Sequence, residues 1–352
     1  MNDESKLDFS CPTPRVAKDQ ILLGHGSGGR LTADLIREIF LPAFRNPVLA
    51  RLDDQAIVSI NGLRLAFTTD SFVVKPLFFP GGDIGSLAVH GTVNDLAMGG
   101  AQPLCLSAAF IIEEGLPMGT LTRVVDSLHR AAESAGVQVV TGDTKVVEKG
   151  SGDGLFINTS GLGIVPEGLC LSADQARPGD CILLSGPIGE HGIAIMAVRE
   201  GLEFESPVES DSAALHGLVA AMLAAAPTGI RCLRDPTRGG LSSALNEIAA
   251  QSRVGMLLDE KAIPVREEVK GACELLGLDP LYVANEGKLV AIVAPEIAEY
   301  ALAAMRSHPL GERAELIGTV TESHPGMVAM RTLIGTTRIV DMLSGDQLPR
   351  IC

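Results

Sequence analysis

The chain has 352 residues, more than one hydrophobic core usually supports, so two domains are expected. Hydrophobic residues make up 46% of it and charged residues 20%, as in a well-packed folded protein rather than a disordered one. The formal net charge of −15 argues against nucleic acid or an anionic membrane as a partner. No apolar run reaches the length of a membrane span.

The N-terminal residues and the cysteines indicate the cellular compartment. The first ten residues, MNDESKLDFS, lack the basic-then-apolar order of a signal peptide, so a cytoplasmic location is expected. The seven cysteines form no CxxC pair, which disfavours a disulfide framework or a zinc ribbon. The sequence nevertheless finishes on the thiol of Cys352, and an exposed terminal thiol calls for an explanation.

Hydrophobic periodicity predicts alternating strands and helices after a loose arm at residues 1–20. In the first half, Asp83 is a plausible N-cap and Gly99-Gly100 a plausible helix end. The predicted elements are a strand at 63–72, a helix at 83–100, a strand at 103–112, a helix around 121–136, and strands at 137–142 and 155–165.

The second half predicts a further set of strands and helices. In chain order they are a strand at 179–187, helices at 193–201, about 211–225 and 240–252, a strand at 254–259, a helix at 265–276, and strands at 288–294, 314–320 and 327–335. Short connections between strands favour the α+β class over α/β. A polar, proline-containing stretch at 166–178 predicts the boundary between an N-terminal domain, 21–170, and a C-terminal domain, 171–340.

The last twelve residues, 341–352, have no periodicity and contain Gly345 and Pro349. Extended, they could span roughly 40 Å, enough to cross a domain face. The sequence therefore predicts a mobile tail that carries Cys352, with Arg350 placed to favour its thiolate.

Two glycine-rich motifs are candidates for phosphate binding. HGSGGR (25–30), with Gly26, Gly28 and Gly29, precedes an amphipathic helix, where backbone N–H groups can face a phosphate. A merely flexible loop is the alternative. RDPTRGG (234–240) places Arg238 before a helix, where phosphate binding and helix capping are both plausible.

Carboxylates follow several predicted elements, each beside small or polar residues. Asp54, Asp70, Asp95 and Asp143 are of the type that holds Mg²⁺ with phosphate oxygens, although single aspartates often serve as caps or turn residues. Lys145 could neutralise a phosphoryl oxygen or be an ordinary surface lysine. Glu286, just before an apolar strand, could be a general base or a turn residue.

Taken together, these motifs resemble the PurM-like family of ATP-dependent enzymes. That family includes aminoimidazole ribonucleotide synthetase, selenophosphate synthetase, thiamine-phosphate kinase and a hydrogenase maturation factor. The ending makes the hydrogenase maturation branch the most similar. The resemblance rests on HGSGGR, TTDSFVV, VHGTVNDLAMGGAQP, VTGDTKVV, LLSGPIGEHGIAI, RDPTRGGL, ANEG and the terminal PRIC.

The resemblance implies a homodimer whose N-terminal domains pair into a barrel-like sheet, with ATP and Mg²⁺ in a cleft between the domains. It implies that the carbamoyltransferase HypF places a carbamoyl group on Cys352. ATP-dependent dehydration of this S-carboxamide would give an S-thiocyanate, whose cyano group passes to iron on the HypC–HypD complex for [NiFe]-hydrogenase. Asp95, Lys145 and Glu286 carry over as further catalytic positions.

Two alternatives remain. A selenophosphate synthetase would need a reactive Cys with a nearby Lys, but Cys11 is followed by Pro12 and Lys18 is not adjacent. Thiamine-phosphate kinase or a ribonucleotide synthetase would have no use for Cys352. The other alternative is a nucleotide-binding scaffold or thiol carrier without turnover, which ATP hydrolysis dependent on a carbamoylated tail would exclude.

Overall fold

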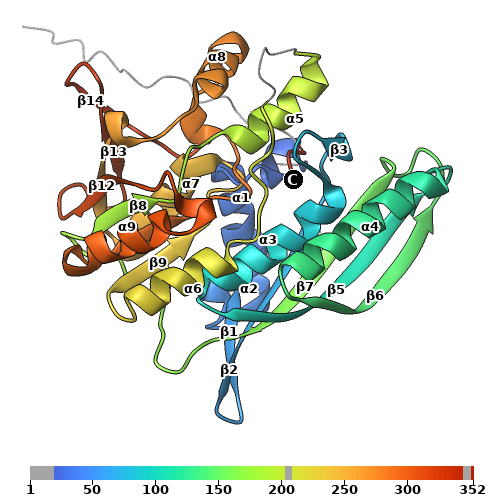
Figure 1. Ribbon diagram of the computed structural model, residues 1–352, viewed down its shortest axis with the longest axis horizontal. Helices are drawn as coiled ribbons and strands as arrows, with labels where there is room; N and C mark the ends of the chain where they lie inside the picture. The colour runs from blue at the N-terminus through green and yellow to red at the C-terminus, as the bar shows by residue number, and fades with distance from the viewer. Residues whose placement is uncertain (1–19, 203–207, 344–349) are drawn as a thin grey trace, which may run out of the picture.

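The computed structural model describes residues 20–202, 208–343 and 350–352. Residues 1–19 of the predicted arm and half of the predicted tail, residues 344–349 with Pro349, lie outside these residues. The described chain contains two main sheets, one from each half of the sequence, and each has its own helices (Figure 1).

The first main sheet has five strands in the order β1-β2-β7-β5-β6. Their bounds are β1 Ala56–Ile60, β2 Leu63–Phe72, β5 Gln102–Glu113, β6 Gln138–Val147 and β7 Leu155–Ile164. Helices α3 (Ile84–Met98) and α4 (Met118–Ser134) pack on one face, and β3 (Phe78–Phe79) pairs with β4 (Gly82–Asp83) beside them.

The predicted helix at 83–100 is confirmed, with its predicted cap. The Asp83 carboxylate accepts hydrogen bonds from the N–H groups of Gly85 and Ser86 at 2.7 and 3.2 Å. The helix ends at Met98, followed by Gly100 at a φ of +70°. Nearly all of α3 is buried, so its polar side chains are held in fixed positions inside the molecule.

The second main sheet has seven strands in the order β14-β13-β10-β12-β8-β11-β9. These are β8 Cys181–Leu184, β9 Ile230–Arg234, β10 Gly255–Asp259, β11 Val290–Val293, β12 Glu315–Thr321, β13 Val328–Arg331 and β14 Thr337–Ile339. Helix α7 (Gly240–Ser252) packs on one face, and α6 (His216–Ala225) and α9 (Ala298–Arg306) on the other.

Shorter or peripheral helices complete the described fold. They are α1 Arg30–Leu35, the π-helix η2 Ile36–Phe40, α2 Leu41–Phe44, α5 Glu190–Glu200 and α8 Glu267–Leu276. The 3₁₀ helices are η1 Leu23–Gly26, η3 Leu49–Arg51, η4 Glu260–Ala262, η5 Pro280–Tyr282, η6 Pro295–Ile297 and η7 Pro309–Gly311.

The structure departs from the sequence prediction at residues 211–215, since the helix expected from about 211 begins only at His216. The Asn94 amide of α3 bonds the backbone oxygen of Ala213 and the N–H of Leu215 at 3.0 and 2.8 Å. These backbone groups therefore bond to α3 instead of closing another helical turn. Strand β1 was not predicted.

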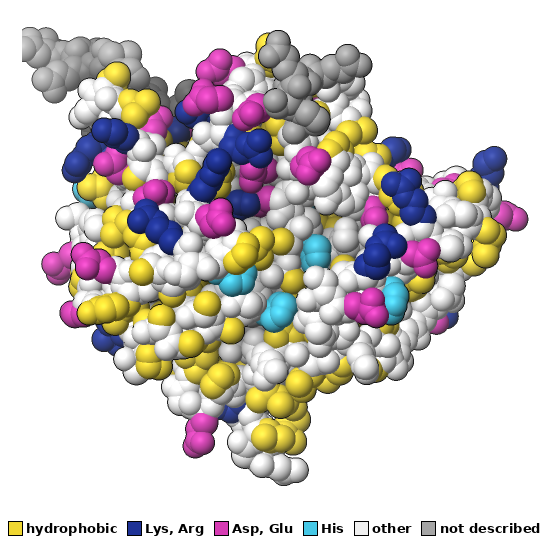
Figure 2. All heavy atoms as spheres, in the orientation of Figure 1, with side chains coloured by type: hydrophobic (Ala, Val, Ile, Leu, Met, Phe, Trp, Pro, Cys, Tyr) yellow, Lys and Arg dark blue, Asp and Glu magenta, His cyan; other side chains and the backbone are white. Residues whose placement is uncertain are grey.

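The expected α+β class is confirmed, and the five-stranded sheet is open in the described chain. Its face opposite α3 and α4 exposes apolar side chains: Phe67, Leu104 and Leu162 are 43%, 44% and 39% exposed. Among the described residues, no helix combines the length and apolar character that a membrane crossing needs. Figure 2 shows acidic and basic side chains interspersed over one face of the molecule.

Candidate functional site

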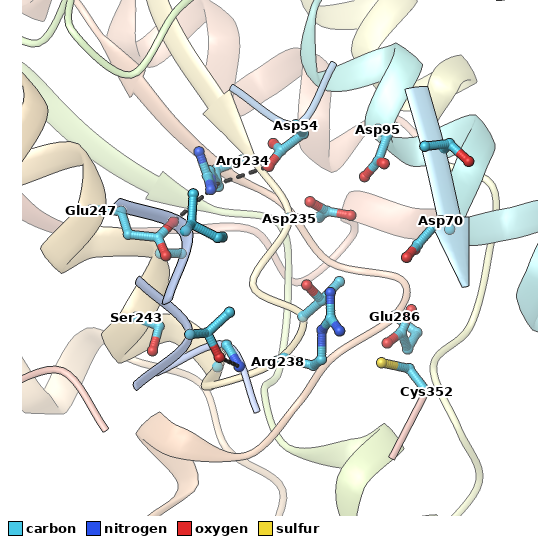
Figure 3. A pocket seen from close by; sticks show the side chains of 18 residues that line it. Asp54, Asp70, Asp95, Arg234, Asp235, Arg238, Ser243, Glu247, Glu286 and Cys352 are labelled. Atoms are coloured by element: carbon cyan, nitrogen blue, oxygen red, sulfur yellow. Dashed lines mark hydrogen bonds and ion pairs between the residues drawn. The ribbon is translucent and has the colours of Figure 1, made fainter. Parts of the chain in front are cut away.

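A cavity of about 290 Å³ lies where the two halves meet. β2 and α3 of the first half contribute to its wall, as do the β9–α7 loop and the loop before β11 in the second half. Its charged and reactive side chains are shown in Figure 3: Asp54, Asp70, Asp95, Arg234, Asp235, Arg238, Glu247, Glu286 and Cys352.

The first half supplies three of the predicted aspartates. Asp95, on α3, accepts a hydrogen bond of 2.7 Å from the hydroxyl of Thr68. Burial raises the pKa of the Asp95 carboxyl well above its ordinary value, and repulsion from neighbouring aspartates adds to the rise. Burial also raises the pKa of Asp70, against the opposing charge of Arg238. The cavity therefore concentrates negative charge that its walls do not fully balance.

Asp54 forms an ion pair with Arg234 of the second half. Arg234 belongs to the same RDPTRGG motif as Arg238. The Arg234 guanidinium lies 3.2 Å from an Asp54 oxygen and 2.5 Å from a Glu247 oxygen (Figure 3). Burial nevertheless raises the pKa of Asp54 to about 8, outweighing the attraction of Arg234. The adjacent Asp53 does not line the cavity; it accepts hydrogen bonds from Ser172.

Asp235 is a site residue that sequence reasoning missed. It is 7% exposed, it lines the cavity, and burial raises its pKa to about 6. The motif RDPTRGG contained the signal, but only Arg238 was singled out from it. Glu247, on α7, was also missed, because a lone glutamate in a helix carries no distinguishing pattern.

Glu286 lies beside the thiol of Cys352 in Figure 3 and is 3% exposed. Burial raises its pKa well above the ordinary value, with further contributions from Asp235 and Asp70, while Arg238 opposes the rise. One of its carboxyl oxygens, Oε1, is buried and has no hydrogen-bond partner among the described residues. A buried acceptor of this kind suits a group that takes a proton from a bound molecule.

The loop of Glu286 is held by Asp211, another residue that the sequence did not reveal. The Asp211 carboxylate accepts from the N–H groups of Glu286 and Gly287, at 3.1 and 3.2 Å, and from Lys288 Nζ at 3.0 Å. Lys288 also lies 3.1 Å from Glu190. Asp211 thus positions the backbone that carries Glu286.

Cys352 reaches the cavity from the end of the chain. Burial is the main cause that raises the pKa of its thiol, and the charge of Arg238 opposes the rise. The sequence assigned this role to Arg350, but Arg350 pairs with Asp153 instead. Arg238 is therefore the guanidinium that favours the thiolate.

The motif HGSGGR reaches the cavity only through Gly28. Gly28 has a φ of +74°, and a Cβ there would lie 2.6 Å from the Cβ of Arg238. A Cβ on Gly29 would lie 2.4 Å from the backbone oxygen of Leu343, whereas Gly26 has no such neighbour within 4 Å. The N–H of Gly28 already bonds Thr32. Gly28 and Gly29 are therefore glycines because neighbouring backbone leaves no room for a side chain at either position.

Lys145 and Asp143 do not line this cavity. They lie on β6, the outer strand of the five-stranded sheet, and pair with each other at 2.7 Å. Their side chains are 69% and 62% exposed. The hydrogen bond from Lys145 lowers the pKa of Asp143. Within one chain, the structure thus separates these two predicted residues from Asp95, Glu286 and Cys352.

Comparison with known proteins identifies the family. The model for the AIR synthase related protein N-terminal domain matches residues 52–165, and the C-terminal domain model matches residues 177–329. Carbamoyl dehydratase HypE of Cupriavidus necator is 59% identical over 353 residues, covering 100% of both chains. This chain belongs to the HypE family of AIR synthase related proteins. The family resemblance and the hydrogenase maturation branch predicted from the sequence are confirmed.

Two solved structures of HypE proteins are similar over most of the chain. HypE in a complex with HypF has a TM-score of 0.83 and 52% identity, covering 88% of this chain and 99% of that one. HypE in complex with ATP has a TM-score of 0.80 and 52% identity, covering 95% of this chain and 100% of that one.

Proposed function

We propose that this chain is an ATP-dependent carbamoyl dehydratase that converts an S-carboxamide on Cys352 to an S-thiocyanate. The observation that carries the proposal is the position of Cys352 beside Glu286 and Arg238 in a carboxylate-lined cavity. The name carbamoyl dehydratase of its relatives, and the ATP complex of a similar HypE, support it.

The chemistry needs a leaving group and a base. The carboxamide oxygen of R–S–C(=O)–NH₂ leaves poorly until ATP phosphorylates it, and it then departs as phosphate. Both N–H protons are lost as the C≡N bond forms, one to the base and one to the departing phosphate, so the sum is S-carboxamide plus ATP to S-thiocyanate, ADP, hydrogen phosphate and a proton. Glu286, with its raised pKa and open oxygen, would accept the N–H proton, and Arg238 would stabilise the negative charge on the transferring group.

A magnesium ion fits the chemistry of this cavity. Asp54, Asp70 and Asp95 offer hard oxygen ligands, and burial raises the pKa of each, so a bound cation would favour their ionised forms. In residues 20–202, 208–343 and 350–352, no three such side chains are gathered closely enough to hold an ion by themselves. We propose that these aspartates hold Mg²⁺ with phosphate oxygens and water as the remaining ligands, which would shield the charge of the phosphates.

We further propose a homodimer formed through the uncovered face of the five-stranded sheet, as a barrel-like pairing requires. The exposed Phe67, Leu104 and Leu162 on that face would become buried. Lys145 and Asp143 lie on the outer strand of this sheet, so dimerisation would bring them to an interface. We propose that Lys145 acts on the transferred phosphoryl group in the cavity of the partner protomer, with Asp143 beside it.

The proposed reaction needs one partner that supplies the carbamoyl group and another that receives the cyano group. A HypF-like carbamoyltransferase would load Cys352, as the HypE–HypF complex supports, and the HypC–HypD complex would receive the cyano group. Because the docked Cys352 is half-buried in the wall of the cavity, we propose that it leaves the cavity for both exchanges.

The test separates loading from dehydration. The chain is incubated with HypF, carbamoyl phosphate and MgATP, and the mass of the Cys352 peptide is followed over time. We expect the wild-type peptide first to gain a carbamoyl group and then to lose the mass of one water, and the Glu286→Gln variant to load without losing water. A carbamoylated Cys352 that persists with MgATP would contradict the dehydratase and favour a thiol carrier.

A further inference from the structure

The end of the chain, marked C in Figure 1, occupies a built binding site that is separate from the reacting groups. The backbone of Arg350–Cys352 runs beside residues 73–75, which follow β2. The N–H of Val73 donates to the backbone oxygen of Cys352 at 3.0 Å, and the N–H of Lys75 donates to that of Arg350 at 3.3 Å. Alternate N–H groups of the segment after β2 thus hold alternate backbone oxygens of the chain end.

A buried histidine holds the middle residue. His191, on α5, is fully buried, and its Nε2 lies 2.9 Å from the backbone oxygen of Ile351. Its Nδ1 lies 2.7 Å from the hydroxyl of Ser210, which itself accepts from the N–H of Ser212. The backbone oxygen of Ile351 can only accept, so the neutral ring carries its proton on Nε2 and donates it to Ile351, and Nδ1 accepts from the Ser210 hydroxyl.

The side chains of the chain end are also fixed. Ile351 is 3% exposed and packs in the same hydrophobic cluster as Val74 and Ile193. Arg350 pairs with Asp153, and its Nε donates to the backbone oxygen of Val73 at 3.1 Å. Arg199 donates to the backbone oxygen of Arg350. Each contact involves a residue that does not line the cavity around Glu286.

The backbone conformation of Arg350 indicates that these contacts are selective. Its φ is +54°, in the left-handed region that non-glycine residues seldom adopt. Such a conformation persists only where the surroundings hold it. The ion pair with Asp153 and the hydrogen bonds to the backbone oxygens of Arg350 and Ile351 provide that hold.

We propose that Val73–Lys75, Asp153, His191 and Arg199 form a recognition site for a peptide ending in Arg-Ile-Cys, called here the tail seat. The tail seat holds Cys352 beside Glu286, and its side chains act by positioning alone. That the tail seat matters for turnover rests on the proposed dehydratase function. That the chain end docks in the tail seat does not depend on that function. The two can therefore fail independently.

The experiment measures how fast iodoacetamide alkylates Cys352 in the full-length protein at pH 8. An Asp-N digest isolates the last seven residues, so the other cysteines do not interfere. We compare the wild type with Asp153→Asn and His191→Phe, and with His191→Gln, which can still donate to Ile351. Glu315→Gln is the matched control, because it breaks an ion pair of similar exposure on β12, away from the tail seat.

We expect alkylation to become about tenfold faster in His191→Phe, which corresponds to about 1.4 kcal/mol of lost docking. Asp153→Asn should accelerate it about threefold, His191→Gln should restore much of the protection, and Glu315→Gln should match the wild type. Equal rates in Asp153→Asn and the wild type would overturn the proposal, even if His191→Phe folds poorly.

A competition experiment tests recognition without any variant. Millimolar Arg-Ile-Ser peptide should displace the chain end and accelerate alkylation of Cys352 in the wild type. Asp-Ile-Ser should not, because it cannot pair with Asp153. If neither peptide changes the rate, or both change it equally, Arg350 is not recognised and the tail seat as described is wrong. Neither result depends on whether the protein dehydrates anything.

Discussion

The raised pKa of Asp235 makes a sharp prediction about stability. Unfolded, this carboxyl ionises near its ordinary value of 3.8, whereas burial raises its pKa in the folded protein to about 6. The folded state thus binds more protons between these two values, and stability falls as the pH rises through this window. A shift of roughly two units corresponds to about 3 kcal/mol lost above pH 6, an upper limit because neighbouring charges readjust.

The substitution Asp235→Asn keeps the shape and removes the charge. We expect the nucleotide-free variant to be more stable than the wild type at pH 7.5, by up to about 3 kcal/mol, and equally stable near pH 4. Urea unfolding at matched protein concentration, from pH 4 to pH 8, measures this difference. Buried groups serving ligand binding often destabilise the free protein in this way.

Asp53→Asn is the matched control, since Asp53 precedes Asp54 but accepts hydrogen bonds from Ser172 and the N–H of Ala173. Losing these charge-assisted bonds should destabilise the protein by about 2 kcal/mol at pH 7.5. The two asparagine variants should therefore change stability in opposite directions. If Asp235→Asn were less stable than the wild type at pH 7.5, the electrostatic account of the cavity would be refuted.

Three further predictions concern the reaction and the assembly. Glu286→Gln should slow dehydration of the carbamoylated chain about 10²–10⁴-fold while ATP still binds, as followed by peptide mass and calorimetry; a normal rate would exclude Glu286 as the base. Phe67→Lys should shift the protein from dimer to monomer in analytical ultracentrifugation, because it places a charge on the uncovered sheet face; an unchanged dimer would place the interface elsewhere. Lys145→Ala should be inactive alone, yet mixing it with Glu286→Gln chains should restore activity, since a mixed dimer contains one intact site. No recovery in demonstrably mixed dimers would argue that Lys145 acts within its own chain.

Local signals predicted the elements that position the cavity. The Asp83 cap and the glycines after Met98 sufficed for α3, because capping and helix termination depend on residues close in sequence. Residues 211–215 were predicted wrongly because the backbone groups of Ala213 and Leu215 bond to Asn94, which is over a hundred residues away. Tertiary hydrogen bonds of that kind leave no trace in the local pattern.

The candidate site was predictable to the extent that motifs marked it. Asp54, Asp70, Asp95, Glu286 and Cys352 were chosen for their sequence context, and all five line one cavity. Asp211 was not predicted, since its role comes from accepting hydrogen bonds from the Glu286 loop. The role of His191 was not predicted, because its bond to Ile351 joins residues 160 positions apart.

The electrostatics of the cavity also explain why loading and dehydration would occur in different places. Inside, burial and the charges of Glu286 and Asp70 raise the pKa of the Cys352 thiol, which disfavours the nucleophilic thiolate there. Outside, the thiol regains its ordinary acidity and can accept the carbamoyl group. The S-carboxamide is neutral, so it enters the carboxylate-lined cavity without the electrostatic cost that a thiolate would meet. We infer that carbamoylation itself favours docking of the chain end, which places the substrate beside Glu286 when it is ready to react.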